Sequence, residues 1–135
     1  MLNPCGSRDT PAFYKIDKKR RMVLSTGAGV LTRKDLDEHQ ERLAKDQDFD
    51  PGFSQLMDFL QVTKIEVTPS DVRVSAERSV FSPSSRRAIL VKDDLAFGLA
   101  RMFQIHRELK GEQGIRVFRE LDAALDWLLG KESES

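Results

Sequence analysis

The residues QLMDFLQVTKIEVTPSDV, numbered 55–72, contain the pattern that decides the fold of this chain. Leucine, methionine and phenylalanine are concentrated in the first five positions, Gln55 to Phe59, and predict a short strand. A helix is predicted to start at Thr68, because this N-cap threonine is followed three residues later by Asp71 and because Pro69 suits the first helical position. Residues 60–67 would form a short crossing segment that connects this strand to this helix. A strand that leads into a helix start is the unit of an open α/β sheet, in which ligands bind beyond the strand ends.

The same alternation of strand and helix runs through the rest of the chain. We predict strands at residues 13–16, 22–25, 55–59, 86–92 and 115–118, and helices that begin near residues 32, 68, 94 and 121, the second of them reaching about residue 80. This order predicts one α/β domain over residues 12–130. Its sheet would have about five mostly parallel strands with an antiparallel first edge strand, and four helices would cover it. Residues 1–11 and 131–135 are expected to be a flexible leader and tail.

Composition narrows the classes of function. The 22 basic and 22 acidic residues cancel, so no overall field attracts nucleic acid. The single cysteine, Cys5, allows neither an internal disulfide nor a cysteine metal cluster, which fits a reducing compartment. No apolar run approaches the roughly 18 residues that a membrane span needs. These features predict a cytoplasmic protein that does not span a membrane.

Motifs for catalysis and cofactor binding are weak. The run from Gly27 to Gly29 precedes a helix start, but Thr32 replaces the third glycine of a dinucleotide loop, so we interpret the run as a tight turn. His39 and His106 lack the spacing of a zinc site, and His39 falls on the apolar stripe of its helix, as a half-buried histidine using one ring nitrogen would. No nucleophile elbow or P-loop is present. The sequence therefore predicts no cofactor, no metal and no enzymatic activity.

Several separated motifs resemble those of a known family, the small bacterial SpoIIAA-like proteins of the STAS/SEC14 type. They are GVLTRKDL at 29–36, DFDP at 48–51, LMDF at 56–59, RRAILV at 86–91, FGLARMF at 97–103, VF at 117–118 and ALDWL at 124–128. The resemblance covers residues 13–129. It implies an α/β sheet backed by helices. It also implies kinship with domains that regulate sigma factors through protein contacts and with domains of lipid-binding and transporter proteins.

In the sigma-factor regulators of this family, a serine at the start of the helix after the central strand is phosphorylated, within a motif like Asp-Ser-Ser-Gly. The matching segment here runs from Thr68 to Asp71 and lacks the serine pair and the glycine. Thr68 and Ser70 nevertheless stand at a helix N-terminus, which would favour a phosphate. Two interpretations stay open for them: plain capping residues, or a site that is modified or bound by a partner.

We predict a non-enzymatic regulatory module that acts through protein contacts, its partner being an unidentified protein or a second copy in a homodimer. The helix from residue 94 supports this, because it has apolar residues on more than one face. The candidate regulatory and partner surface comprises Asp58, Thr68, Ser70, Asp71, Met102 and Phe103. The alternative is a carrier or sensor of a small apolar or lipid-like ligand, held between the sheet and that helix.

Overall fold

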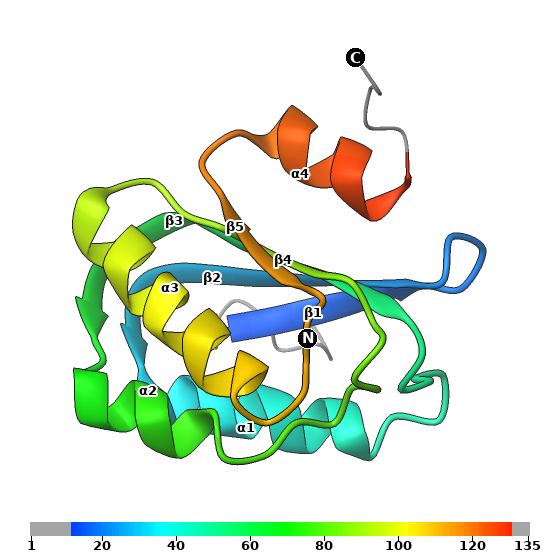
Figure 1. The fold of residues 1–135 in the computed structure, drawn as a ribbon, viewed down its shortest axis with the longest axis horizontal. Helices are drawn as coiled ribbons and strands as arrows, with labels where there is room; N and C mark the ends of the chain where they lie inside the picture. The colour runs from blue at the N-terminus through cyan, green and yellow to red at the C-terminus, as the bar shows by residue number, and fades with distance from the viewer. Residues whose placement is uncertain (1–11, 131–135) are drawn as a thin grey trace, which may run out of the picture.

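The computed structural model describes residues 12–130 (Figure 1). The predicted leader, which includes Cys5, and the predicted tail lie outside the described residues. Nine elements follow one another in the described part of the chain: β1 (Ala12–Asp17), β2 (Met22–Thr32), α1 (Arg33–Ala44), β3 (Ser54–Glu66), α2 (Pro69–Ser75), β4 (Arg87–Leu90), α3 (Asp94–Glu108), β5 (Ile115–Phe118) and α4 (Leu121–Leu128). No helix within these residues is both long and apolar enough to cross a bilayer.

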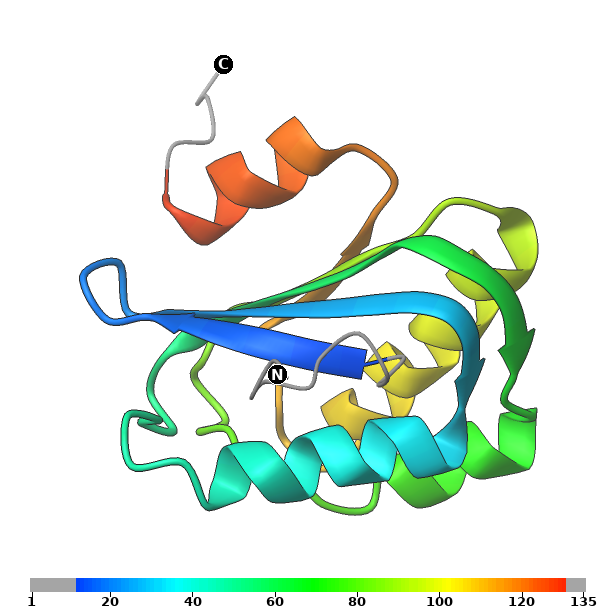
Figure 2. The same ribbon diagram turned by 180° about the vertical axis from the view of Figure 1, so that it is seen from behind.

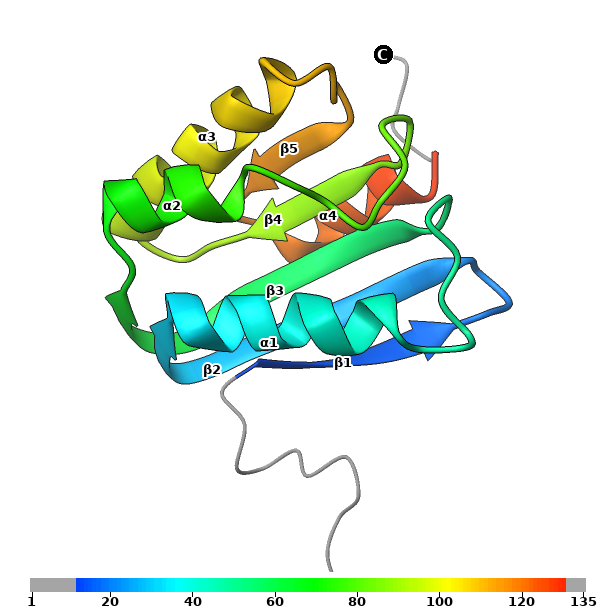
Figure 3. The ribbon, with the colours of Figure 1, turned by 90° about the horizontal axis from the view of Figure 1, so that it is seen from below.

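The five strands form one sheet in the order β1-β2-β3-β4-β5. β1 pairs with β2 in the antiparallel sense, and the other three pairs of neighbouring strands are parallel. Helices α1, α2 and α3 cover one face and α4 covers the other (Figures 1 and 2). Seen from the three-helix side, α1 lies toward β1 and α3 lies toward β5 (Figure 3). The predicted fold, a single α/β domain with an antiparallel first edge strand, is confirmed.

Alternating side chains divide the core between the two faces. Leu56, Ala88 and Leu90 pack with Trp127 and Leu128 beneath α4. The neighbouring positions on the same strands point the other way, because successive side chains of a strand alternate. The largest cluster on that second face joins Ile89, Val91 and Ile115 to α3, and another joins Val23, Leu43, Phe53 and Phe81 near α1. All four residues of β4 are buried, as expected for a strand covered on both faces.

β2 and β3 are much longer than the sequence predicted. The run at Gly27 to Gly29 is part of β2 rather than a turn, and residues 60–66 are strand rather than a crossing. Both predictions were wrong because the two segments pair with each other, and neither shows its partner locally. β3 contacts β4 only as far as Asp58. Beyond that point β2 and β3 continue as a ribbon with two register shifts, which bend it toward α1 and α2 (Figures 1 and 2).

The predicted helix starts at residues 32 and 68 are confirmed by reciprocal capping. Thr32 and Asp35 form a capping box at α1, and Thr68 and Asp71 form another at α2. The predicted extension of α2 to about residue 80 is wrong, since the helix ends at Ser75. Residues 80 and 81 instead pack against the cluster near α1, which takes the chain off the helical path.

Candidate ligand-binding site

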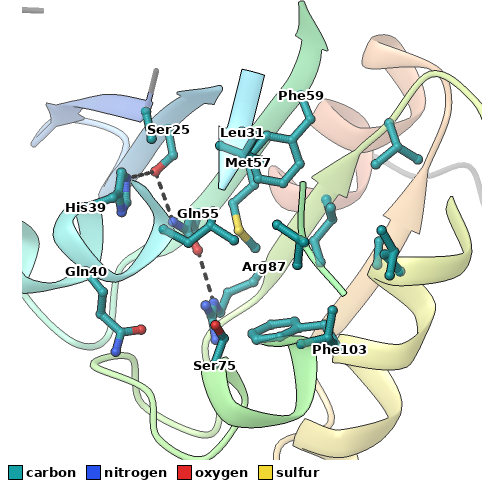
Figure 4. Close-up of a pocket in the computed structure, with 18 of the residues that line it drawn as sticks. Ser25, Leu31, His39, Gln40, Gln55, Met57, Phe59, Ser75, Arg87 and Phe103 are labelled. Atoms are coloured by element: carbon teal, nitrogen blue, oxygen red, sulfur yellow. Dashed lines mark hydrogen bonds between the residues drawn. The ribbon is translucent and has the colours of Figure 1, made fainter. Parts of the chain in front are cut away.

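A cavity of about 150 Å³ lies between the sheet and the three helices α1, α2 and α3 (Figure 4). Most of its wall is apolar, and the side chains that form this part include Leu31, Met57, Phe59, Ile65, Ile89 and Val91 from the sheet and Val72, Ala96, Ala100 and Phe103 from the helices. An apolar cavity of about this size holds a molecule such as benzene. The space therefore suits a compact ligand about as large as one aromatic ring.

The bent ribbon of β2 and β3 closes one end of this cavity. Leu31 near the end of β2, together with Ile65 and Val67 at and just after the end of β3, contributes to the wall. Leu31 and Ile65 lie in the parts of the strands that reach past β4, and Val67 directly follows β3. The extension that the sequence did not predict thus supplies one part of the cavity wall.

Buried polar side chains form a chain of hydrogen bonds at another part of the cavity wall (Figure 4). Nε of Arg87 donates to Oε1 of Gln55 at 3.1 Å, and Nε2 of Gln55 donates to Oγ of Ser25 at 2.9 Å. Oγ of Ser25 lies 2.9 Å from Nε2 of His39. The four residues come from β4, β3, β2 and α1, are all buried, and all line the cavity.

One direction of donation satisfies this chain. A guanidinium group can only donate, so Arg87 fixes Oε1 of Gln55 as an acceptor and turns the amide nitrogen toward Ser25. Burial is the largest cause that lowers the pKa of His39 to about 4, followed by the charges of Arg42 and Arg87. The imidazole is therefore neutral near pH 7, and in the tautomer protonated at Nδ1 its Nε2 accepts a hydrogen bond from the hydroxyl of Ser25.

Arg87 also belongs to a buried ion cluster with Glu112 and Arg107. Its Nη1 lies 3.3 Å from Oε2 of Glu112, and Nε of Arg107 lies 2.6 Å from Oε1 of the same carboxylate. The guanidinium of Arg87 stacks on the ring of Phe81, with 4.5 Å from Cζ to the ring centroid. Burial lowers the pKa of Arg87, and the neighbouring Glu112 opposes that shift. The cluster holds the guanidinium group in one place at the cavity wall.

Ser75, the last residue of α2, lines the cavity close to this cluster. Its Oγ atom is buried and has no hydrogen-bond partner among residues 12–130. Figure 4 shows the hydroxyl of Ser75 directed toward the guanidinium end of Arg87, with the ring of Phe103 nearby. Buried hydroxyl groups are nearly always hydrogen-bonded, so an unpaired one beside a cavity points to a group that enters from the cavity.

Ser25 and His39 have the atoms of a nucleophile and a base, but their setting favours binding over proton transfer. The hydroxyl of Ser25 is held by the amide of Gln55 as well as by His39. The lowered pKa of His39 makes its ring a weak base. No carboxylate within residues 12–130 hydrogen-bonds the imidazole, and no group of three or more metal-binding side chains occurs in that part of the chain.

The predicted regulatory residues lie in three different places. Thr68 and Asp71 bond each other's backbone in the capping box, the backbone N–H of Thr68 lowers the pKa of Asp71, and Ser70 is exposed beside them. Asp58, where β3 leaves β4, accepts a hydrogen bond from the backbone of Leu60. Met102 is half-buried on α3, whereas Phe103 lines the cavity. A regulatory surface at these residues stays a prediction.

The polar residues of the cavity were missed by sequence reasoning. Ser25, Gln55, Ser75 and Arg87 line the cavity, and Glu112 pairs with Arg87. They come from separate segments, and each is an ordinary polar residue in the sequence. The only local signal was the placement of Arg87 directly before the apolar run of β4. A charged side chain at that position must either reach solvent or find a buried partner.

Comparison with known proteins supports the fold. No protein-family model and no curated protein sequence matches the chain. A solved structure of an uncharacterised protein of the DUF3478 family from Shewanella loihica PV-4, described as having a SpoIIAA-like fold, is similar with a TM-score of 0.55. The similarity covers 87% of this chain and 93% of that one at 18% sequence identity, so it concerns the fold alone. The chain therefore has a SpoIIAA-like fold, as its sequence resemblance implied.

Proposed function

We propose that this chain is a single-domain binding module that takes up one small, largely apolar molecule between its sheet and helices α1 to α3. The observation that carries the proposal is the cavity of about 150 Å³, with apolar walls and a few buried polar groups. That combination is typical of small-molecule sites, where apolar walls supply affinity and a few polar groups fix orientation.

The sequence left open a lipid-like ligand as the alternative, and the size of the cavity limits how large such a ligand can be. A space suited to one aromatic ring cannot enclose a long acyl chain. The proposed ligand is therefore a single-ring compound or one with a short alkyl chain. A carrier of whole membrane lipids would need a larger cavity than this fold provides between its sheet and α3.

A cavity-filling variant tests the proposal. Ala100 is buried and lines the cavity from α3, so Ala100→Leu would occupy part of the space, whereas Ala123→Leu makes the same change at an exposed position of α4. We expect toluene or benzoate to raise the melting temperature of the wild type and of Ala123→Leu, and to have little effect on Ala100→Leu. Native mass spectrometry of the purified wild type would show whether a small molecule copurifies. If no probe shifts the wild type and nothing copurifies, the proposal fails.

A second candidate function, protein contact through the outer side of α3, rests on a different observation. Leu95, Ile105 and Leu109 are 63%, 45% and 80% exposed. With Gly98 and Met102 they fall at successive spacings of three, four, three and four residues, the pattern of a coiled-coil seam. We call these five residues the α3 seam. Four of its residues are exposed and Met102 is half-buried, and a seam of this kind gains stability by packing against another helix.

We propose a second copy of the chain as the occupant of the α3 seam. Arg101 and Glu108 flank the seam on one side. In the proposed dimer, two copies of α3 pair in antiparallel fashion around Met102 and Ile105. Arg101 of each copy then faces Glu108 of the other copy. Leu109 of each copy packs into the space above Gly98 of the other. No neighbouring atom lies within 4 Å of a β-carbon placed at Gly98, so that space is open.

Light scattering coupled to size-exclusion chromatography tests this pairing. We expect a dimer that Ile105→Glu abolishes, while Val74→Glu, at an exposed apolar residue of α2, leaves it intact. Arg101→Glu and Glu108→Arg should each weaken the dimer, and the double variant should restore it because the opposite charges then face each other again. A monomer at high micromolar concentration would rule the pairing out.

A further inference from the structure

We propose that the cavity selects a small carboxylate with a compact apolar body, its carboxylate bound by Arg87 and Ser75. This inference rests on the proposed ligand-binding function and adds the charge of the ligand. Three observations carry it: the charge of the buried cluster, the hydrogen-bonding atoms that remain available, and the apolar wall opposite them.

The buried ion cluster holds one more positive charge than negative charge. Arg87, Arg107 and Glu112 are all buried, and both guanidinium groups share the single carboxylate. The other acceptors for the two arginines are the amide oxygen of Gln55, the hydroxyl of Ser79 and the backbone carbonyl of Ala76. All three are uncharged. A buried charge without a counter-ion is costly, so an anion in the cavity would stabilise this cluster.

Two hydrogen-bonding groups at the cavity are available to such an anion. Arg87 donates through Nε and Nη1, while its Nη2 has no acceptor among residues 12–130. The Oγ of Ser75 also has no partner there, and Figure 4 shows it directed toward the same guanidinium group. A carboxylate has two acceptor oxygens, so one can meet the guanidinium and the other the hydroxyl.

Other titratable groups near the cavity do not supply the missing negative charge. His39 is held by Ser25 at the far end of the hydrogen-bond chain from Arg87, and its ring is uncharged near neutral pH. Asp37 lines the cavity from α1, but its carboxylate lies 3.4 Å from Nε of Arg33 on the same helix, and about half of its side chain is exposed. Its charge is therefore paired and screened by solvent.

The wall beyond Arg87 determines the rest of the ligand. Met57 lies on the sheet side and Phe103 on α3 (Figure 4), and both belong to the apolar cluster that contains Ile89 of β4. A carboxylate anchored at Arg87 would therefore place an attached ring or short alkyl chain against apolar side chains. Benzoate and hexanoate have this form, and benzyl alcohol and hexanol match them in size without the charge.

The experiment compares these matched probes by isothermal titration and thermal shift near neutral pH. We expect benzoate and hexanoate to bind at least tenfold more tightly than benzyl alcohol and hexanol. Equal affinities for charged and neutral probes would overturn the inference and leave the proposed function standing. If neither class binds, the proposed function fails as well.

Ser75→Ala tests the placement of the carboxylate without removing a charge. We expect it to lower the affinity for benzoate by about three- to tenfold and to leave the affinity for toluene unchanged. Ser70→Ala is the matched control, because Ser70 is an exposed serine on the same short helix. If benzoate binds Ser75→Ala as tightly as the wild type, the carboxylate does not lie where we place it. Arg87→Gln, if it folds, should abolish the preference for carboxylates over alcohols.

Discussion

Nε of Arg107 lies 2.6 Å from Oε1 of Glu112, and both side chains are nearly inaccessible to solvent. Glu112 also accepts hydrogen bonds from Arg87, so two buried guanidinium groups share this one carboxylate. We expect Glu112→Gln to lower the free energy of unfolding by about 3–5 kcal/mol, because it leaves both cations without a counter-ion. Urea denaturation followed by the fluorescence of Trp127, the only tryptophan, measures this loss.

The matched control for that variant is Glu77→Gln. Glu77 pairs with Lys110 at 3.3 Å, but both side chains are well exposed, at 61% and 44%. Removing this pair should cost less than about 1 kcal/mol, since solvent screens it. Equal losses for the two variants would mean that the buried cluster contributes no more than a surface pair.

His39 should make the stability of the folded chain depend on pH. Burial holds its pKa at about 4 in the folded state, against 6.5 for an ordinary histidine. Below pH 6.5 the unfolded chain therefore binds a proton that the folded chain does not. Stability is lost as the pH falls from about 6.5 to about 4, by about 3 kcal/mol in total, and His39 causes no further loss below that range.

Denaturation curves at several pH values in this window check the prediction, with His39→Gln as the comparison. Glutamine can still accept a hydrogen bond from Ser25 but does not titrate. We expect the variant to lose much less stability between pH 6.5 and 4 than the wild type does. The carboxylates contribute the same background to both proteins, so parallel curves would show that His39 is not the cause.

Local signals in the sequence were sufficient for the order of elements and for the helix starts. Thr32 with Asp35, and Thr68 with Asp71, each carry a complete capping signal within four residues, and both capping boxes form. The apolar run of β4 is equally local. Patterns of this kind do not depend on distant parts of the chain, which is why the α/β fold could be predicted.

The cavity could not be predicted in the same way. The end of β2 and the end of β3 become strands only because they pair with each other across more than 30 positions of sequence. Ser25, Gln55 and Arg87 are buried together for a similar reason: Gln55 lies opposite Arg87 in the sheet, and Ser25 lies two residues along β2 from the partner of Gln55. A single polar residue carries no local sign of such a partner, so the site appears only in three dimensions.

Tyr14, the only tyrosine, should ionise at unusually high pH in the folded chain. Burial, together with the hydrogen bond and the negative charge of Asp46, 2.7 Å away, raises its pKa to about 12. We expect little tyrosinate absorbance near pH 11, where an ordinary tyrosine is mostly ionised, and its appearance when urea is added. Asp46→Asn should move the ionisation toward lower pH. Ionisation near pH 10 in the folded wild type would contradict this environment for Tyr14.

Gly27 should tolerate no side chain, because it faces the ring of Phe59 across the bent ribbon. A β-carbon placed at Gly27 would lie 2.7 Å from the ring, closer than carbon atoms approach without a shift. Phe59 lines the cavity, so the ring can move away only by entering that space or by disturbing the ribbon. We expect Gly27→Ala to lower the free energy of unfolding by about 1–3 kcal/mol.

Two measurements distinguish the ways in which the Gly27→Ala variant can adjust. The two measurements are the free energy of unfolding and the affinity for benzoate. If Phe59 moves into the cavity, both should fall. If the ribbon shifts instead, the free energy of unfolding falls and the cavity wall at the ribbon is displaced. Gly98→Ala is the control, since a β-carbon there meets no atom within 4 Å and alanine favours a helix interior, so stability should rise by about 0.5–1 kcal/mol. A neutral effect of Gly27→Ala would contradict the close packing of Phe59 against β2, and with it the wall that the ribbon gives to the cavity.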